Sequence, residues 1–242
     1  MVTILTRYIA GGYFLVKSVE RPPSMAADLL PKRILSLSNC ICPSVRTTWG
    51  WEEDELLDAS DFGVADGKLE ELHEWSVTGE IDFPNVFLTL AAARSFARDF
   101  LVNVEHTHLL GIGLPRDFAD AFLTHKQTVY DPTSDTHHEL TIGVSRMIAD
   151  RHLLAPEGTP LGFEVLSYIQ SLGHSWLCSG LERDMQQLFG IRPNAHGFID
   201  TEAEAMQVYA WIAEDEQRGI RAEPEPYYPW LIMDYPLTEN ES

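Results

Sequence analysis

The sequence predicts an α+β fold, in which a mixed or antiparallel sheet packs with helices in a single compact domain spanning residues 1–242. Strand patterns dominate the amino-terminal part, and helical and strand patterns mix over the rest of the chain. The hydrophobic content is 45% of 242 residues, which is enough for a chain of this length to bury a sizeable core.

The first expected element is a hairpin or a bulged pair of strands over residues 3–19. Both halves are rich in β-branched and aromatic side chains, and Gly11-Gly12 lies between them. Residues 34–38 alternate apolar and polar side chains, as a half-buried strand does. Residues 47–51 are expected to be loop or short strand. Residues 52–58 are expected to begin a helix, since early carboxylates suit the positive end of its dipole.

Helical patterns then become stronger. Apolar side chains at helical spacing predict a helix over residues 68–75. A second helix is expected over residues 86–101, opened by Asp82-Phe83-Pro84, because proline is tolerated in a first turn. Residues 109–123 fit a strand followed by a helix. The turn-rich residues 127–138 are the candidate boundary if the chain is subdivided.

The carboxyl-terminal part is expected to hold strands over residues 140–148 and 163–169 and a helix over 180–189 that Gly190 ends. A last strand or a pinned arm is expected over residues 229–236. Between these elements a further helix should begin with a capping box, formed by Thr201 and Glu204. The same helix should bury one face, which holds Ala205, Val208, Tyr209 and Ile212.

Charge is the distinctive feature of the composition. There are 37 Asp and Glu residues against 17 Lys and Arg, a formal net charge of −20. Residues 51–74 carry ten acidic and one basic side chain, and residues 200–242 carry eleven and two. A negative field repels phosphate, so the composition argues against nucleic acids and anionic membranes as partners. The same field accelerates encounter with a basic protein.

Paired tryptophans stand next to the densest run of carboxylates. Tryptophan is a frequent interface anchor, and carboxylates meet the Arg and Lys side chains of a basic partner. The alternative is a core tryptophan beside a solvated helix start. We expect these residues to bind the partner: Trp49, Trp51, Glu52, Glu53, Asp54, Glu55 and Asp58.

His174 and Cys178 form a candidate catalytic pair in the stretch SLGHSWLCSGLE. Their spacing would place both side chains on one face of a helix, and a catalytic cysteine needs a neighbouring base. Cys178, however, is framed by Trp176, Leu177 and Leu181, and cysteine in such company behaves as a small hydrophobe. We therefore expect a packing role in the interior and assign no catalytic residue.

Other histidines and cysteines allow a metal site only if distant segments converge. His106 and His108 would share one side of a strand, and His137-His138 lie near acidic residues. The spacing of Cys40 and Cys42 is too short for the usual zinc motif, so we assign no metal ligand and no cofactor. Three cysteines, an odd number, indicate reduced thiols. The amino terminus has neither a signal-peptide nor a membrane-span pattern, so a cytoplasmic protein is expected.

The block LGFEVLSYIQSLGHSWLCSGLERDMQQLFGIRPNAHGFID, residues 161–200, resembles uncharacterised bacterial proteins of the type that serve as immunity partners in polymorphic toxin systems. The resemblance covers about a sixth of the chain. It implies a non-enzymatic protein that neutralises a toxin by covering its active face. The alternatives are a hydrolase, using the Cys178–His174 pair or a metal site built from histidines, and a scaffold subunit of a homo-oligomer. The pattern leaves the oligomeric state open.

Overall fold

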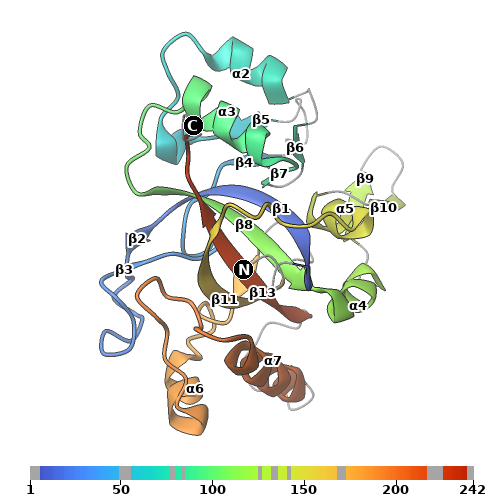
Figure 1. Ribbon diagram of the computed structural model, residues 1–242. Coiled ribbons are helices and arrows are strands. Elements are labelled where there is room, and N and C mark those ends of the chain that lie inside the picture. The colour runs from blue at the N-terminus through green and yellow to red at the C-terminus, as the bar shows by residue number, and fades with distance from the viewer. Residues whose placement is uncertain are drawn as a thin grey trace.

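The computed structural model confirms an α+β fold in one compact domain (Figure 1). It describes residues 6–48, 56–76, 80–82, 85–124, 127–131, 136–140, 143–167, 173–216 and 226–238. None of the helices in this part of the chain combines the length and the apolar character that a membrane span requires.

A curled seven-stranded sheet forms the centre of the molecule, and each pair of neighbouring strands in it is antiparallel. Its strands are β1 (Tyr8–Lys17), β6 (Ile81–Asp82), β7 (Val86–Phe87), β8 (Thr107–Pro115), β11 (Thr159–Ser167), β12 (His174–Ser175) and β13 (Tyr227–Tyr235). Their order in the sheet is β12-β11-β13-β8-β1-β7-β6.

Shorter strand pairs lie outside this sheet. They are β2 (Val19–Glu20) with β3 (Arg33–Ile34), β4 (Arg46–Thr48) with β5 (Leu56–Asp58), and β9 (Gln127–Asp131) with β10 (Thr136–Leu140). The last pair occupies the residues that the sequence marks as a candidate boundary.

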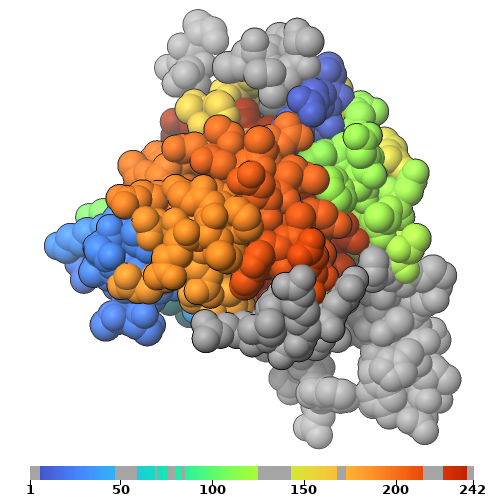
Figure 2. Space-filling model, turned by 90° about the horizontal axis from the view of Figure 1, so that it is seen from below, coloured from blue at the N-terminus to red at the C-terminus, as the bar shows by residue number. Residues whose placement is uncertain are grey.

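The helices surround the sheet. In Figure 1, α2 and α3 lie above it and α6 and α7 below it, and Figure 2 shows residues 173–216 covering the centre of the lower face. Helix α5 packs against β1, and α7 packs against β13 and β11. The α-helices are α2 (Leu69–Ser76), α3 (Leu90–Phe100), α4 (Ala119–Thr124), α5 (Gly143–Asp150), α6 (Glu182–Phe189) and α7 (Glu202–Glu216), and two short 3-10 helices are η1 (Ser60–Phe62) and η2 (Arg116–Phe118).

The amino-terminal glycines lie inside one continuous strand, so of the two alternatives for residues 3–19 the hairpin is wrong, whereas a bulge is present. β1 pairs with β8 along its whole length, and the register shifts between Ala10 and Gly12. Gly12 has φ +111°, and a Cβ atom there would overlap the side chain of Val86. The glycines therefore form a bulge where neighbouring strands approach closely, rather than a turn.

The burial pattern shows that two other predicted strands are wrong. Residues 140–148 were expected to be extended, but Gly143–Asp150 form helix α5, whose buried Val144, Met147 and Ile148 follow a helical spacing. Residues 34–38 do not alternate between core and solvent, because all five are buried. Only Arg33–Ile34 of that region belong to a strand.

Two helix starts also differ from the pattern. Residues 56–58 form strand β5 rather than the early turns of a helix. The helix expected over residues 86–101 begins at Leu90, because Val86–Phe87 pair with β1 and β6 first. Thr89 caps it by accepting the Ala92 N–H at 3.0 Å, which satisfies a free backbone donor.

The remaining expected elements are confirmed as far as the structure describes them; residues 49–55 and 168–169 lie outside the described residues. Helix α6 ends at Gly190, which has φ +73°, and Thr201 and Glu204 exchange the hydrogen bonds of a capping box at the start of α7. β13 contains Pro229 because β13 pairs with β8 only from Leu231 onwards. At Pro229 the missing donor therefore faces no second strand.

The close approach at Gly12 can be tested by Gly12→Ala, with Gly67→Ala as the matched control. Both glycines have positive φ, but a Cβ at Gly67 would meet no atom within 4 Å. We expect Gly67→Ala to lower the free energy of unfolding by about 1 kcal/mol, from backbone strain. Gly12→Ala should lower it by about 3 kcal/mol, because overpacking adds to the strain. Equal losses in urea unfolding would contradict the close approach.

Candidate functional site

Most of the predicted partner-binding residues lie outside the described residues. These are Trp49, Trp51, Glu52, Glu53, Asp54 and Glu55. Asp58 is the last residue of β5, where its backbone pairs with that of Arg46. The structure therefore describes the residues that follow residues 49–55 but not residues 49–55 themselves.

The acidic residues that follow the segment lie on the surface. The side chains of Asp61, Asp66, Glu70, Glu71 and Glu74 are all exposed. Lys68 forms an ion pair with Glu71 at 2.5 Å. Lys17 also reaches this area, because its Nζ donates to the Asp61 carbonyl at 2.9 Å. Two basic side chains thus stand among five exposed carboxylates, so negative charge remains in excess on this part of the surface.

Two exposed valines lie beside these carboxylates. Val102 is 66% exposed and Val104 is 45% exposed. The Val102 N–H donates to the Gly63 carbonyl at 3.1 Å, so this valine adjoins the acidic segment. We call Asp61, Asp66, Glu70, Glu71, Glu74, Val102 and Val104 the acidic–valine surface.

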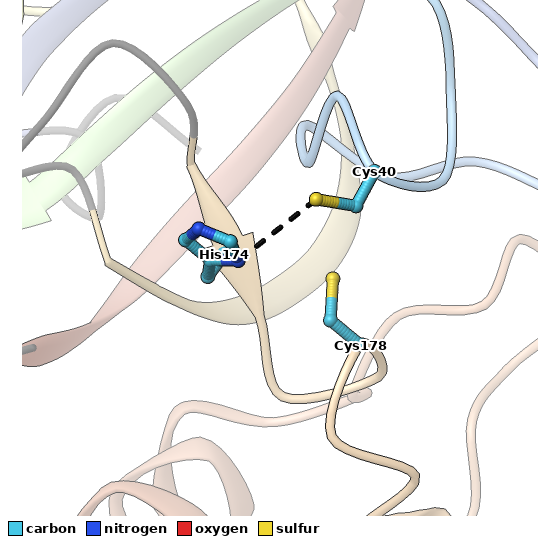
Figure 3. A group of neighbouring side chains, drawn as sticks. All are labelled: Cys40, His174 and Cys178. Atoms are coloured by element: carbon cyan, nitrogen blue, oxygen red, sulfur yellow. Dashed lines mark hydrogen bonds between the residues drawn. The ribbon is translucent and has the colours of Figure 1, made fainter. Parts of the chain in front are cut away.

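A second feature brings two thiols and an imidazole together from separate segments. His174 lies in β12, the edge strand that pairs with β11 through Ser167. Cys178 lies in the turn that follows β12, and Cys40 lies in a turn after β3. Figure 3 shows the three side chains around a shared space. We call Cys40, His174 and Cys178 the thiol–imidazole cluster.

The cluster is compact and lies at the edge of the protein surface. The two Sγ atoms and a nitrogen of the imidazole all lie within 4.8 Å of one another. Cys40 Sγ is 3.9 Å from His174 Nδ1. Cys40 and Cys178 are exposed and His174 is half-buried. Within the described ranges this is the one set of three such ligand atoms that converges.

A buried carboxyl holds the two cysteine-bearing segments in place. Glu164, in β11, is 0% exposed. It accepts hydrogen bonds from Ser36 Oγ at 2.5 Å and from the Leu37 N–H at 3.0 Å, and the Ser175 hydroxyl donates to it as well. Glu164 thereby joins the loop that precedes Cys40 to the strand that precedes Cys178.

Ser38 connects this network to the cluster. Its backbone N–H donates to Ser36 Oγ at 3.0 Å, and its own hydroxyl lies 3.1 Å from Cys178 Sγ. The Cys40 N–H donates to the same Ser38 hydroxyl at 3.3 Å. One serine therefore positions both cysteines relative to each other.

Burial dominates the proton affinities of this region. It raises the pKa of the Cys178 thiol to about 11, with the hydrogen bonds from Ser38 and Ser175 acting in the opposite direction. Burial also raises the pKa of Cys42 to about 12 and the pKa of Glu164 above its ordinary value. Cys178 thus exposes surface as a residue, while its sulfur is enclosed enough to stay protonated at neutral pH.

The structure revises the sequence-based interpretation of His174 and Cys178. They do not share a helix, since one lies in a strand and the other in the next turn. Cys178 is exposed as a residue while burial raises the pKa of its thiol, so it fills the interior only in part, next to the buried Trp176 and Leu177. The structure also brings Cys40 Sγ to 3.9 Å from His174 Nδ1, and the sequence did not place Cys40 there.

The other histidine candidates lie apart from the cluster. His106 is exposed and lies 3.4 Å from Glu105, and His108 Nδ1 lies 3.5 Å from Asp234 Oδ2. His137 and His138 belong to β10, and their side chains lie outside the described part of the structure. Glu164 was also missed; its only signal in the sequence is a charged residue inside the apolar run LGFEVLS.

The arrangement suits ligand binding better than nucleophilic catalysis. Catalysis by Cys178 would need its free thiolate, whereas burial raises the pKa of this thiol. A metal ion also binds the thiolate, but the ion displaces the proton as it binds. Two sulfurs and an imidazole at these separations are, in contrast, the donor set that thiophilic metal ions prefer. No family model, curated protein or solved structure matches the chain.

The three thiols should differ in their rates of alkylation. At about pH 8, a pKa of about 11 gives Cys178 a thiolate fraction about 100-fold smaller than a pKa of 9.0 would give. We expect iodoacetamide to modify the exposed Cys40 first, Cys178 much more slowly and the buried Cys42 last. Peptide mass spectrometry over time measures the order. Cys178 reacting first would contradict the enclosed sulfur.

Glu164 should make stability fall as pH rises above its ordinary pKa of 4.5. Because its pKa is higher in the folded state, the folded protein binds this proton more tightly than the unfolded chain does. The resulting stabilisation is complete below 4.5 and is lost as pH rises through the folded-state pKa. Glu164→Gln cannot titrate, so its unfolding free energy should vary less over this range. Parallel curves in urea titrations of the two proteins would exclude this role.

Proposed function

We propose that the protein binds a basic protein partner through the acidic–valine surface together with the adjoining residues 49–58. The observation that carries this proposal is the exposure of five carboxylates of residues 61–74 beside Val102 and Val104. Carboxylates attract Lys and Arg of the partner, and the valines supply apolar area that closes against it.

The charge of the whole chain supports this choice of partner. With a net charge of −20, long-range repulsion disfavours acidic proteins and phosphate-rich ligands, whereas a basic protein is drawn in. The long-range field acts mainly on the association rate, and the short-range contacts act on the lifetime of the complex.

The partner we propose is a bacterial toxin, whose active face the chain would cover. This step rests on the resemblance of residues 161–200 to immunity partners of polymorphic toxin systems. An inhibitor of this kind acts where the toxin would otherwise work, so we place it in the cytoplasm. Three cysteines without a disulfide suit that reducing compartment.

A hydrolase is the second candidate, favoured by the convergence of His174 with the two thiols. It ranks lower because burial raises the pKa of Cys178 and so lowers the thiolate population. Alkylation of Cys178 ahead of the exposed Cys40 would favour the hydrolase.

The test of the proposed function is co-expression with the product of the gene immediately upstream. We expect that product to be basic and to arrest growth in a bacterial host, and this chain to restore growth. The double variant Glu70→Lys, Glu74→Lys should slow association about 10-fold at low salt and flatten its salt dependence. Stopped-flow or surface plasmon resonance measures both quantities.

The matched control is Asp117→Lys, Asp150→Lys. It makes the same change of charge at two exposed carboxylates of η2 and α5, outside the acidic–valine surface. We expect a smaller effect, since only the long-range field changes. Equal slowing by both pairs would show that net charge acts without a defined surface. An upstream product that neither arrests growth nor binds would overturn the toxin assignment.

A further inference from the structure

We infer that the thiol–imidazole cluster binds a thiophilic divalent metal ion, zinc, through Cys40 Sγ, His174 Nδ1 and Cys178 Sγ. This site is separate from the acidic–valine surface and does not depend on the proposed partner. Three lines of evidence support it, namely the separations of the ligand atoms, their support by neighbouring groups and the access of solvent to them.

The separations are close to those that zinc requires. Zinc bonds are about 2.3 Å to sulfur and about 2.0–2.1 Å to a histidine nitrogen. In a tetrahedral site a sulfur and a nitrogen are therefore about 3.5 Å apart, and two sulfurs about 3.8 Å apart. Cys40 Sγ and His174 Nδ1 are 3.9 Å apart, and no pair exceeds 4.8 Å. Shifts of about 1 Å or less, within the reach of side-chain rotation, would complete the geometry.

The groups behind the ligands match those that support metal sites. The Ser38 hydroxyl, 3.1 Å from Cys178 Sγ, can donate a hydrogen bond to a metal-bound thiolate. Ser38 itself is oriented by Ser36, and Ser36 donates to the buried Glu164. The ligand residues Cys40 and Cys178 are thus held in place by an internal hydrogen-bond network.

The three ligands leave one coordination position for water or a substrate. Cys40 is exposed and Cys178 lies partly at the surface, so an ion can reach the cluster from the side of Cys40. A three-ligand zinc centre with an open position is the arrangement found in catalytic zinc sites, whereas closed four-ligand sites are structural. Binding one Zn²⁺ to two thiols and a neutral imidazole releases two protons, which leaves two thiolates bound to the ion.

The test uses the purified, reduced full-length protein after metal removal with a chelator. Titration with ZnCl₂ against a chromophoric chelator should show one equivalent of zinc per chain. Co²⁺ added to the same protein should give the ultraviolet thiolate-to-cobalt charge-transfer band and the visible bands of a tetrahedral site. In weak buffer, zinc binding should release about two protons per ion.

Variants locate the site. Cys40→Ser, His174→Ala and Cys178→Ser should each weaken zinc binding at least 100-fold, and Ser38→Ala, which removes a supporting hydrogen bond, should weaken it about 10-fold. Cys42→Ala is the matched control, because this thiol is buried and donates to the Ile34 carbonyl outside the cluster. Circular dichroism confirms that each variant is folded.

The outcomes separate clearly. One equivalent of zinc that is lost in the three ligand variants and kept in Cys42→Ala supports the inference. Zinc binding that survives in the Cys40→Ser, Cys178→Ser double variant overturns it, as does a folded, reduced wild-type protein that binds no zinc. Partner binding is measured separately, so failure of either proposal leaves the other testable.

Discussion

The hydrogen bonds to the buried Glu164 carboxyl are the constraint on which the site region depends. A carboxyl group with no exposure is costly unless its oxygens are satisfied. Here Ser36, Leu37 and Ser175 supply the donors. Since these donors come from two segments far apart in the chain, satisfying one carboxyl also joins those segments. Removing it would leave several buried donors without an acceptor.

This constraint explains how residues 36–38 can be held in the interior without belonging to a strand. Residues 36–38 lie outside every strand pair of the described structure, yet they are fully buried. The Glu164 carboxyl takes the place of a neighbouring strand by accepting the Leu37 N–H. Ser38 then extends the order outward to Cys40 and Cys178. The hydrogen bonds that satisfy the buried Glu164 carboxyl thus also fix the positions of the cysteines nearer the surface.

The two proposed activities make different physical demands on the chain. Attraction of a basic partner relies on the sum of many charges acting over about a Debye length, so no single carboxylate is decisive. The acidic–valine surface can meet that demand because its carboxylates are exposed. A metal site requires a few atoms to be placed within about half an ångström, which only a buried supporting network provides.

Some sequence-based expectations for individual elements survived and others failed for identifiable reasons. The capping box of Thr201 and Glu204 and the termination of α6 at Gly190 are local interactions, and both were predicted correctly. The stretch 140–148 was misjudged because short apolar runs with β-branched residues fit a strand or a helix equally well. Its packing against β1 selected the helix. At Gly11-Gly12 the local sequence leaves a hairpin and a bulge open, because the approach of Val86 to Gly12 depends on a distant segment.

The sequence by itself determined the fold class and the negative charge, because composition and hydrophobic periodicity can be read from local sequence. Only the tertiary structure decided that Cys40 would meet His174 and Cys178, which follow it by more than a hundred residues. Glu164 brings them together, and its partners Ser36 and Ser175 are assigned by the folding of the chain rather than by any spacing within it. Contacts between distant segments depend on how strands pair and loops close, which no local pattern encodes.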